Sequence, residues 1–434
     1  MGNQLLKRVR ETRVSMRKQQ LYLVFEDFDK ECMQLTLDNR REKYAKMLES
    51  PFRFFRGSAY LFYSDLVKIP SIFHTSDERP IWIMGDMHMD NFGAFENEAG
   101  QIVYDVNDFD EGYVGSYLYD IMRMSVSIAL YMEEQKLSSS TQEKAIRQFA
   151  TSYLKQLRRF KQGKDNPATL MFTKENTTGP IKKVLKKLES KQRTNLVEDL
   201  TQIDEVGKRS FIWTEEVQKI SEQEYTDIQA TLPQYAIKDI AIKYGSGTAS
   251  IGLKRYYILV GANEACKQED LLLEMKEVRT AIPAYFLHYN ERFWKHYAHQ
   301  GARVVGTQKA MHHLEDPYLA YVTMNDTEYY IRERSPFKKK VKPKNYKAIE
   351  DYYETTEIMG KVAAKIHARA DNDYSELIEH QSEKEILSTI GDYQAVFIDF
   401  LIHNAMAYKD IVNQDYQVFK QWIERPESQL NSAE

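Results

Sequence analysis

Apolar and polar residues follow two different periods along the chain, and these periods divide it into three parts. Residues 1–50 place apolar side chains at helical spacing among many charges, and mostly helical patterns fill residues 140–235. From about residue 236 to 345, short β-branched and aromatic runs are separated by glycine-rich or Asn-Asp turns. Helical spacing returns over residues 346–425. This order predicts a two-lobed α+β fold in which a small antiparallel β lobe is inserted between two parts of a helical lobe.

Several individual elements can be predicted from these patterns. Two strands are expected at 81–86 and 101–110, joined through NFGAFENEAG with a turn at Glu98–Gly100. A helix is expected over GARVVGTQKAMHHL, and a β-hairpin should turn at Asn325-Asp326. We therefore expect four segments: an N-terminal helical and aromatic extension (1–75), the first part of a large lobe with a helical insert (76–235), a small β lobe (236–345) and the second part of the large lobe (346–434).

Composition and charge narrow the classes of protein. The 434 residues carry a net charge of -4 from many charges of both signs, which argues against a nucleic-acid partner. Cys32 and Cys266 are too few for a disulfide framework and indicate a reducing compartment. No apolar run has the length of a membrane span, and the N-terminus lacks the apolar stretch of a signal peptide. We expect a cytoplasmic protein without a membrane partner.

The acidic segments GDMHMDN and NDFD are the first candidates for chemistry. Asp86 after one strand, Asn91 five residues later and Asp108 at the next strand's end are expected to meet at one mouth. Carboxylate and amide oxygens are suitable ligands for Mg²⁺, although residues at such positions also cap turns. His88 is either a loop-ordering residue or a ligand. Asp110, taken to lie on the same strand face as Asp108, would support the metal from behind. A dinuclear phosphoesterase site is disfavoured because the further histidine ligands are missing.

A glycine cluster lies between two predicted strands in YGSGTASIG. Glycine lets backbone N–H groups approach phosphate oxygens, although a plain hairpin would have a similar sequence. Its candidate phosphate-contacting residues are Gly245, Ser246, Gly247, Thr248 and Gly252. One strand later, Lys276 is either an edge-strand gatekeeper or a cation directed at phosphates, with Glu274 on the same face. Arg56 in FFRGSA either pairs with a carboxylate or binds phosphate.

Together these motifs resemble the aminoglycoside-phosphotransferase-like branch of the kinase superfamily. The segment GDMHMDN…VNDFDEGYVGSYLYD is similar to its catalytic and metal-binding loops. The resemblance implies that Asp86 is the catalytic base, with His88 in the same loop, and that Asp120 orders this loop. It further implies that Asn91 and Asp108 hold Mg²⁺ and that Lys276 contacts ATP phosphates. YYIRERSP, which contains Glu333, resembles the strand entering the hinge that binds adenine.

The order of these parts differs from that of an ordinary kinase. Here the catalytic loop comes first, and the helix GKVAAKIHARAD that should precede it lies near the C-terminus. We therefore expect a circularly permuted kinase-like fold. Met84 replaces a usual histidine, and the helix that should pair a glutamate with Lys276 offers only Gln308. Residues 51–336 also resemble the bacterial domain of unknown function 2252 family.

The expected function is that of an ATP- and Mg-dependent phosphotransferase acting on a hydroxyl of a small molecule or a protein. One alternative is a nucleotide-binding pseudokinase or scaffold, suggested by Met84 and by the missing glutamate. A second alternative is a nucleotidyl transferase on the same fold. The acceptor and the oligomeric state are not indicated by any motif.

Overall fold

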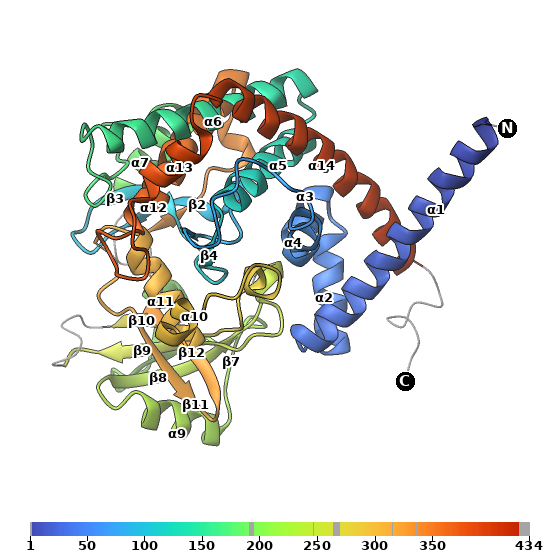
Figure 1. The fold of residues 1–434 in the computed structure, drawn as a ribbon. Coiled ribbons are helices and arrows are strands. Elements are labelled where there is room, and N and C mark those ends of the chain that lie inside the picture. Colours follow the sequence, from blue (N-terminus) through green and yellow to red (C-terminus); the bar gives the residue numbers. More distant parts are fainter. Residues whose placement is uncertain are drawn as a thin grey trace.

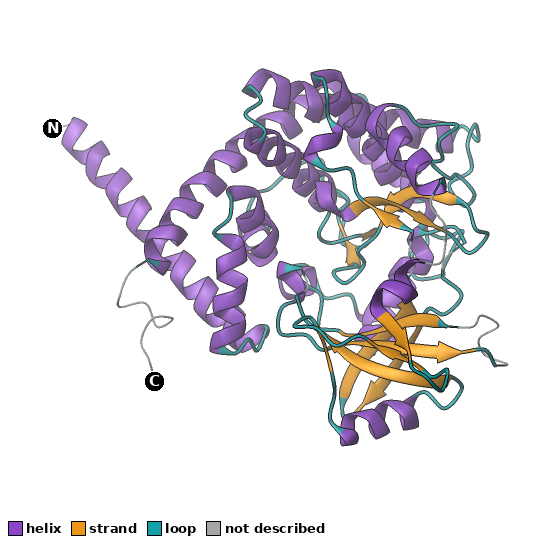
Figure 2. Ribbon diagram, turned by 180° about the vertical axis from the view of Figure 1, so that it is seen from behind, coloured by secondary structure: helices purple, strands orange, loops and turns teal. Residues whose placement is uncertain are grey.

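The computed structural model describes residues 2–190, 195–245, 247–263, 270–314, 316–334 and 337–424. These residues form a mixed α+β fold with several antiparallel sheets. Figure 1 shows a large helical part and a separate sheet-rich part below it, and Figure 2 shows the same division from behind. The N-terminal helix α1 (Gly2–Leu23) projects from the body of the molecule.

Helices occur in both parts and build most of the larger one. After α1 and a π-helical segment at Val24–Cys32, they are α2 (Leu37–Met47), α3 (Pro51–Gly57), α4 (Ala59–Leu66), α5 (Leu118–Glu134), α6 (Ser139–Lys161), α7 (Gly179–Glu189), α8 (Asn195–Leu200), α9 (Glu222–Thr231), α10 (Glu291–His296), α11 (Gln300–Met311), α12 (Ile349–Arg369), α13 (Ser382–Ile390) and α14 (Gln394–Ile423). Helix α5 is buried along nearly its whole length and packs against α6 and α14. A helix that is apolar all round belongs in the centre of a core, and α5 therefore fixes the position of the loops that precede it.

Within the described residues the strands form four sheets, all antiparallel. They are β1 (Ile81–Ile83), β2 (Phe92–Glu96), β3 (Ile102–Val106), β4 (Tyr113–Gly115), β5 (Thr201–Ile203), β6 (Arg209–Phe211), β7 (Val217–Gln218), β8 (Ala236–Lys243), β9 (Arg255–Gly261), β10 (Leu271–Glu277), β11 (Ala320–Met324), β12 (Thr327–Glu333) and β13 (Lys338–Lys339). The largest sheet has the order β11-β12-β10-β9-β8-β7. Pairs β1-β4 and β5-β6 and the triplet β13-β2-β3 complete the set.

The two faces of the six-stranded sheet differ in character. On one face Leu273 and Met275 of β10 pack in a core with Ile228 of α9. The intervening residues Glu274 and Lys276 point to the opposite face, as alternation along a strand requires. Lys276 there forms an ion pair with a residue of the larger part, so this face is directed toward the large lobe.

Several sequence-based predictions are confirmed by the elements. Strands β8 to β12, the helix α11 and the helical C-terminal region occur where they were expected. Asn325 and Asp326 both have positive φ, of 49° and 59°, and connect β11 to β12. A two-residue turn with both φ positive matches the right-handed twist of the flanking strands.

Two predictions about the first strands are wrong. The segments at 81–86 and 101–110 do not form a hairpin, because β1 pairs with β4 and β3 pairs with β2. The strand β2 lies in a stretch that looked like a connecting loop, since Gly93 interrupts its apolar pattern. Gly93 makes room there for the Asn107 side chain, whose Nδ2 would lie 2.6 Å from a Cβ at this position. In addition, β3 ends at Val106, so Asp110 lies in a loop and not on a strand face beside Asp108.

The segment at 140–235 also contains more strand than its pattern predicted. It carries β5, β6 and β7 besides three complete helices and a fourth that begins at Ser139. These strands are two or three residues long, too short to show a period in the sequence. Strand β7 joins the edge of the six-stranded sheet through β8, so that sheet begins before residue 236.

Candidate functional site

The loop after β1 is held in a defined conformation by its backbone. Gly85 has φ of +83°, and a Cβ at this position would lie 2.0 Å from the carbonyl oxygen of Glu111. Asp120, in the first turn of α5, accepts hydrogen bonds from the backbone N–H groups of Met84 at 2.6 Å and Gly85 at 2.9 Å. Because the buried Asp120 carboxylate holds the backbone of these two residues, it also fixes the position of Asp86, which follows Gly85.

Asp120 belongs to a buried polar chain that crosses the large lobe. Its Oδ2 lies 3.2 Å from Nε2 of His367 on α12, and Nδ1 of His367 is 2.9 Å from the hydroxyl of Tyr153 on α6. The resemblance expected a histidine at position 84, in the loop itself. In this protein the histidine comes from α12 and not from the loop: it is His367, which contacts the Asp120 carboxylate that binds the loop backbone.

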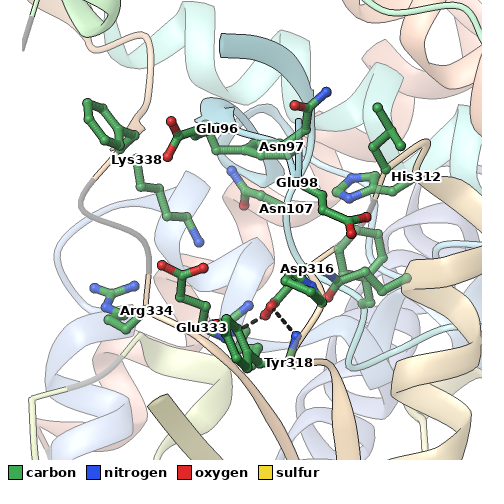
Figure 3. A pocket seen from close by; sticks show the side chains of 17 residues that line it. Glu96, Asn97, Glu98, Asn107, His312, Asp316, Tyr318, Glu333, Arg334 and Lys338 are labelled. Atoms are coloured by element: carbon green, nitrogen blue, oxygen red, sulfur yellow. Dashed lines mark hydrogen bonds between the residues drawn. The ribbon is translucent and has the colours of Figure 1, made fainter. Parts of the chain in front are cut away.

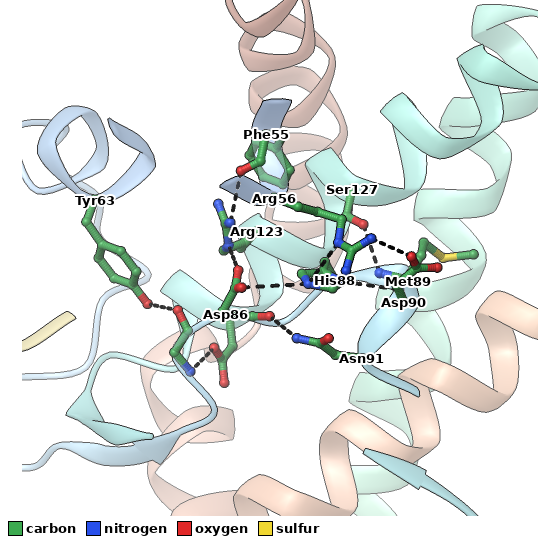
Figure 4. A network of polar contacts seen from close by, with 12 residues as sticks. Phe55, Arg56, Tyr63, Asp86, His88, Met89, Asp90, Asn91, Arg123 and Ser127 are labelled. Atoms are coloured by element: carbon green, nitrogen blue, oxygen red, sulfur yellow. Dashed lines mark hydrogen bonds and ion pairs between the residues drawn. The ribbon is translucent and has the colours of Figure 1, made fainter. Parts of the chain in front are cut away.

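Asp86 is the central side chain of the site. Its carboxylate forms an ion pair with Nε of Arg123, a fully buried residue of α5 whose Nη2 also donates to the carbonyl of Phe55 at 3.1 Å. Figure 4 shows Asp86 between Arg123 and His88. Burial raises the pKa of Asp86 to about 6, against the opposing effect of Arg123. Near neutral pH Asp86 is therefore mostly ionised but still able to accept a proton, as a general base must.

His88 and Arg56 close one side of this network. Nδ1 of His88 accepts from the backbone N–H of Asp90 at 3.2 Å, while Arg56 contacts Nε2 at 3.3 Å and binds Asp90 at 2.6 Å. Burial, and then the charge of Arg56, lower the pKa of His88 well below its usual value. His88 therefore has the geometry of a neutral, loop-ordering residue. Arg56 forms the carboxylate pair, one of the two alternatives for it, and a contact with phosphate stays a prediction.

Asn91 and Asp108 line one cleft together with Asp86. Nδ2 of Asn91 donates to the backbone carbonyl of Asp86 at 2.8 Å, which leaves the amide oxygen as the acceptor that could bind a cation. The side chain of Asp108 is exposed to this cleft. Among the described residues no group of three or more His, Cys, Asp or Glu side chains is arranged to hold a metal ion. Mg²⁺ bound to a nucleotide needs only one or two protein oxygens beside the phosphates, so this donor set fits it.

Lys276 of β10 contacts a residue that lines this cleft. Its Nζ forms an ion pair with Asp110, whose carboxylate follows Asp108 by two residues. The helix α11 carries no acidic residue and contributes Arg303 instead. The Arg303 guanidinium donates to the carbonyls of Asp110, Gly112 and Arg279 at 2.7, 2.9 and 2.8 Å. The partner of Lys276 is therefore supplied by the acidic loop and not by this helix.

The glycine hairpin folds onto the N-terminal extension and closes the site. Gly245 and Gly252 have positive φ of 73° and 80°, a conformation that favours glycine, and Gly247 does not. A Cβ on Gly57 of α3 would lie 3.1 Å from the Thr248 side chain. Thr248 lines a second, smaller cavity together with Asp86. Ser246 lies outside the described residues.

Two side chains at the site, Arg123 and Glu111, are absent from the sequence-based predictions. Arg123 interrupts the apolar run of α5, and this isolated charge was the signal that could have identified it. Glu111 lines both cavities that contain Asp86 and accepts from the backbone N–H of Ile282 at 2.5 Å. Burial raises the pKa of Glu111 to about 7. No pattern in the sequence indicates that this carboxyl is enclosed.

Glu333 lies in a different place, at the end of β12. Its backbone N–H donates to Asp316 at 2.5 Å. Glu333 and Asp316 line a larger cavity of about 140 Å³ (Figure 3), which is bounded by the β2–β3 hairpin, the loop after α11 and the segment after β12. This cavity contains neither Asp86 nor Lys276. The Glu333 N–H is thus engaged within the protein, and contact of this segment with adenine stays a prediction.

The fold and the site define an α+β protein with a buried acidic centre between a helical part and an antiparallel sheet. A family model described as "Uncharacterized protein conserved in bacteria (DUF2252)" matches residues 38–422. The chain belongs to this family. Comparison with curated proteins gave no match, and comparison with solved structures gave none. No helix in the described part of the chain combines the length and apolar character needed to cross a membrane.

Proposed function

We propose that this protein is an ATP- and Mg-dependent phosphotransferase with a circularly permuted kinase-like fold. The observation that carries the proposal is convergence: Lys276 of the sheet pairs with Asp110, and Thr248 of the glycine hairpin shares a cavity with Asp86. A phosphate-covering hairpin, a strand lysine, metal-binding oxygens and a carboxylate base are the parts that kinases combine. The antiparallel pairs β1-β4 and β2-β3, which frame the Asp86 and Asp108 loops, support the same interpretation.

Each residue has a role in the proposed reaction. Asp86 takes the proton of the acceptor hydroxyl while that oxygen bonds to the γ-phosphorus and the bond to the β–γ bridging oxygen breaks, so that ADP leaves. Asn91 and Asp108 would hold Mg²⁺, which neutralises charge on the phosphates. Lys276 would exchange Asp110 for phosphate oxygens. Arg123 keeps Asp86 in place, and Asp120 positions the backbone before it.

Calorimetry with ATP in the presence and absence of Mg²⁺ tests the proposal. Asp108→Ala should abolish the Mg-dependent part of binding, because it removes the exposed carboxylate of the cleft. Asp86→Asn should retain nucleotide binding while losing transfer of the γ-phosphoryl group. Identical Mg-dependent binding by the wild type and Asp108→Ala would count against the assignment.

A pseudokinase or scaffold is the second candidate, and a specific observation favours it. Lys276 is held by Asp110, and α11 offers Arg303 where kinases offer a glutamate. Incubation with γ-labelled ATP and a cell lysate separates the two, since a scaffold transfers no label to any acceptor. Parallel incubation with α-labelled ATP detects nucleotidyl transfer, the remaining alternative.

A further inference from the structure

The N-terminal helix α1 extends beyond the rest of the molecule. Its second half is anchored to the large lobe: Arg17 pairs with Asp65 of α4 at 2.7 Å and with Asp415 of α14 at 2.5 Å. Leu21 is buried there. By contrast, every side chain from residue 4 to residue 16 is exposed, and Figures 1 and 2 both show this half of α1 away from the other elements. Isolated helices of this length are marginally stable in water, so the first half of α1 is a surface that a partner would stabilise.

Several apolar side chains are exposed on this first half. Leu5, Val9 and Met16 are 65%, 41% and 63% exposed, and Leu6 is exposed as well. Successive residues of an α-helix are about 100° apart around its axis, so Val9 and Met16 lie between Leu5 and Leu6 in one sector. A sector of about 100° is wider than the seam that a single partner helix covers in a coiled coil. It matches the apolar face of a helix that lies in a membrane interface.

The same helix is strongly basic, although the whole chain has a net charge of -4. Among its 22 residues Glu11 is the one acidic side chain, against six basic ones. The basic residues are Lys7, Arg8, Arg10, Arg13, Arg17 and Lys18. Arg8 and Arg10 are exposed, lie on opposite sides of the apolar sector and form no ion pair within the described residues. A second copy of α1 would bring like charges together, so the charge of this helix favours an anionic partner.

We propose that α1 docks on an anionic lipid surface, with its apolar sector among the upper acyl chains and its arginines at the lipid phosphates. Arginine and lysine have long apolar stems, so their charged ends reach the headgroups from the sides of an apolar sector. The helix lies along the surface and does not cross it, and no helix in the described part of the chain is fit to cross a membrane. The expectation of no membrane partner concerned spanning segments, which such a helix does not need. This docking is independent of the proposed phosphotransferase activity.

Co-sedimentation of the full chain with lipid vesicles tests the docking. Vesicles of phosphatidylglycerol and phosphatidylcholine in equal parts are compared with vesicles of phosphatidylcholine alone, at about 0.1 M salt. The wild type should bind the anionic vesicles more tightly. Replacing Arg8 and Arg10 together by Gln should weaken this binding about thirtyfold, since each basic residue near an anionic surface contributes about fivefold. Replacing Leu5 and Val9 together by Gln, which keeps helix propensity, should weaken it at least about tenfold through lost apolar burial.

The helix α7 supplies a matched control for charge. Lys186 and Lys187 are exposed on this basic helix, whose apolar residues Val184 and Leu185 are buried. Replacing both lysines by Gln should leave vesicle binding unchanged.

Three results would overturn the docking of α1 on lipid. An equal loss in the α7 control and the Arg8/Arg10 variant would show general attraction of basic surfaces to the vesicles. A wild type that does not bind anionic vesicles would leave an acidic protein as the occupant. Sedimentation velocity without lipid gives the third: self-association of the wild type that is lost in the Leu5/Val9 variant would identify a second copy as the occupant.

Discussion

Lys276 of the six-stranded sheet forms an ion pair with Asp110, which lines the Asp86 cleft, although 166 positions separate the two residues in the chain. Burial lowers the pKa of Lys276, but Asp110, Tyr330 and Asp108 together raise it above its usual value, so that the ammonium group stays charged. The pair joins the six-stranded sheet to the loop that follows β3. In this pair Lys276 already has an anionic partner, and it is the lysine that the proposed function assigns to nucleotide phosphates.

Replacing Asp110 tests both consequences of this pair. Asp110→Asn leaves a buried cation unpaired and should lower the free energy of unfolding by about 3 kcal/mol. Phosphates would then supply the missing charge, so Mg·ATP should raise the melting temperature of the variant by more than that of the wild type. Thermal unfolding with and without Mg·ATP measures both effects. The control is Asp399→Asn, which breaks an exposed pair with Arg147 and should change neither. An equal ligand-induced shift in Asp110→Asn and the wild type would exclude contact between Lys276 and phosphate.

Glu111 gives a prediction about stability and pH. Its pKa rises from 4.5 in the unfolded chain to about 7 in the folded protein, mainly through burial. Between pH 4.5 and 7 the folded protein therefore keeps a proton on Glu111 that the unfolded chain has lost. The free energy of unfolding falls as pH rises through this range. Glu111→Gln should remove this loss. At pH 8 its free energy of unfolding, measured by chemical denaturation, should exceed that of the wild type by up to about 3 kcal/mol. At pH 4.5 the two should differ little. A variant that is less stable at pH 8 would contradict the assignment.

Gly85 is expected to be intolerant of any side chain. Its φ of +83° strains other residues, and the Cβ of alanine would meet the Glu111 carbonyl oxygen at 2.0 Å. Gly85→Ala should therefore cost at least about 3 kcal/mol, measured by chemical denaturation. Gly163→Ala is the control: its φ is +64° but nothing lies within 4 Å, so it should cost only about 1 kcal/mol. Similar losses in both variants would show that strain, not the clash, dominates.

The protonation of Asp86 predicts the pH dependence of phosphoryl transfer. With a pKa of about 6, Asp86 is ionised above that value and protonated below it. The rate of label transfer should not change with pH above 7. Below pH 6 it should decrease by up to about tenfold for each pH unit. Binding of Mg·ATP, followed by calorimetry at each pH, should change much less. A transfer rate that does not fall between pH 7 and 5 would rule out Asp86 as the base.

Local features of the fold could be predicted because nearby residues determine them. The Asn325-Asp326 turn needs two residues that tolerate positive φ, and it joins two strands that follow each other directly in the chain. The placement of Lys276 opposite Met275 follows from alternation along one strand. The glycines at 245 and 252 mark conformations that other residues rarely adopt. Each of these depends on residues that are close together in the chain.

Strand pairing and ion pairing could not be predicted in the same way. The choice of β4 as partner of β1, and of Asp110 as partner of Lys276, depends on which distant segments the core brings together. Arg123 meets Asp86 because α5 runs through the centre of the large lobe. Short strands such as β5 and β6 lack the length to show a period, and only pairing stabilises them.

By itself the sequence determined the family, the order of helical and sheet regions and the residue types available for chemistry. These follow from local periodicity and from motifs, in which neighbouring residues act together. Only the tertiary structure decided that α2 brings Lys43 beside the Asp86 cavity and that Asp110 neutralises Lys276. The reason is physical: burial and charge compensation arise between segments that are distant in the chain, and no local pattern records them.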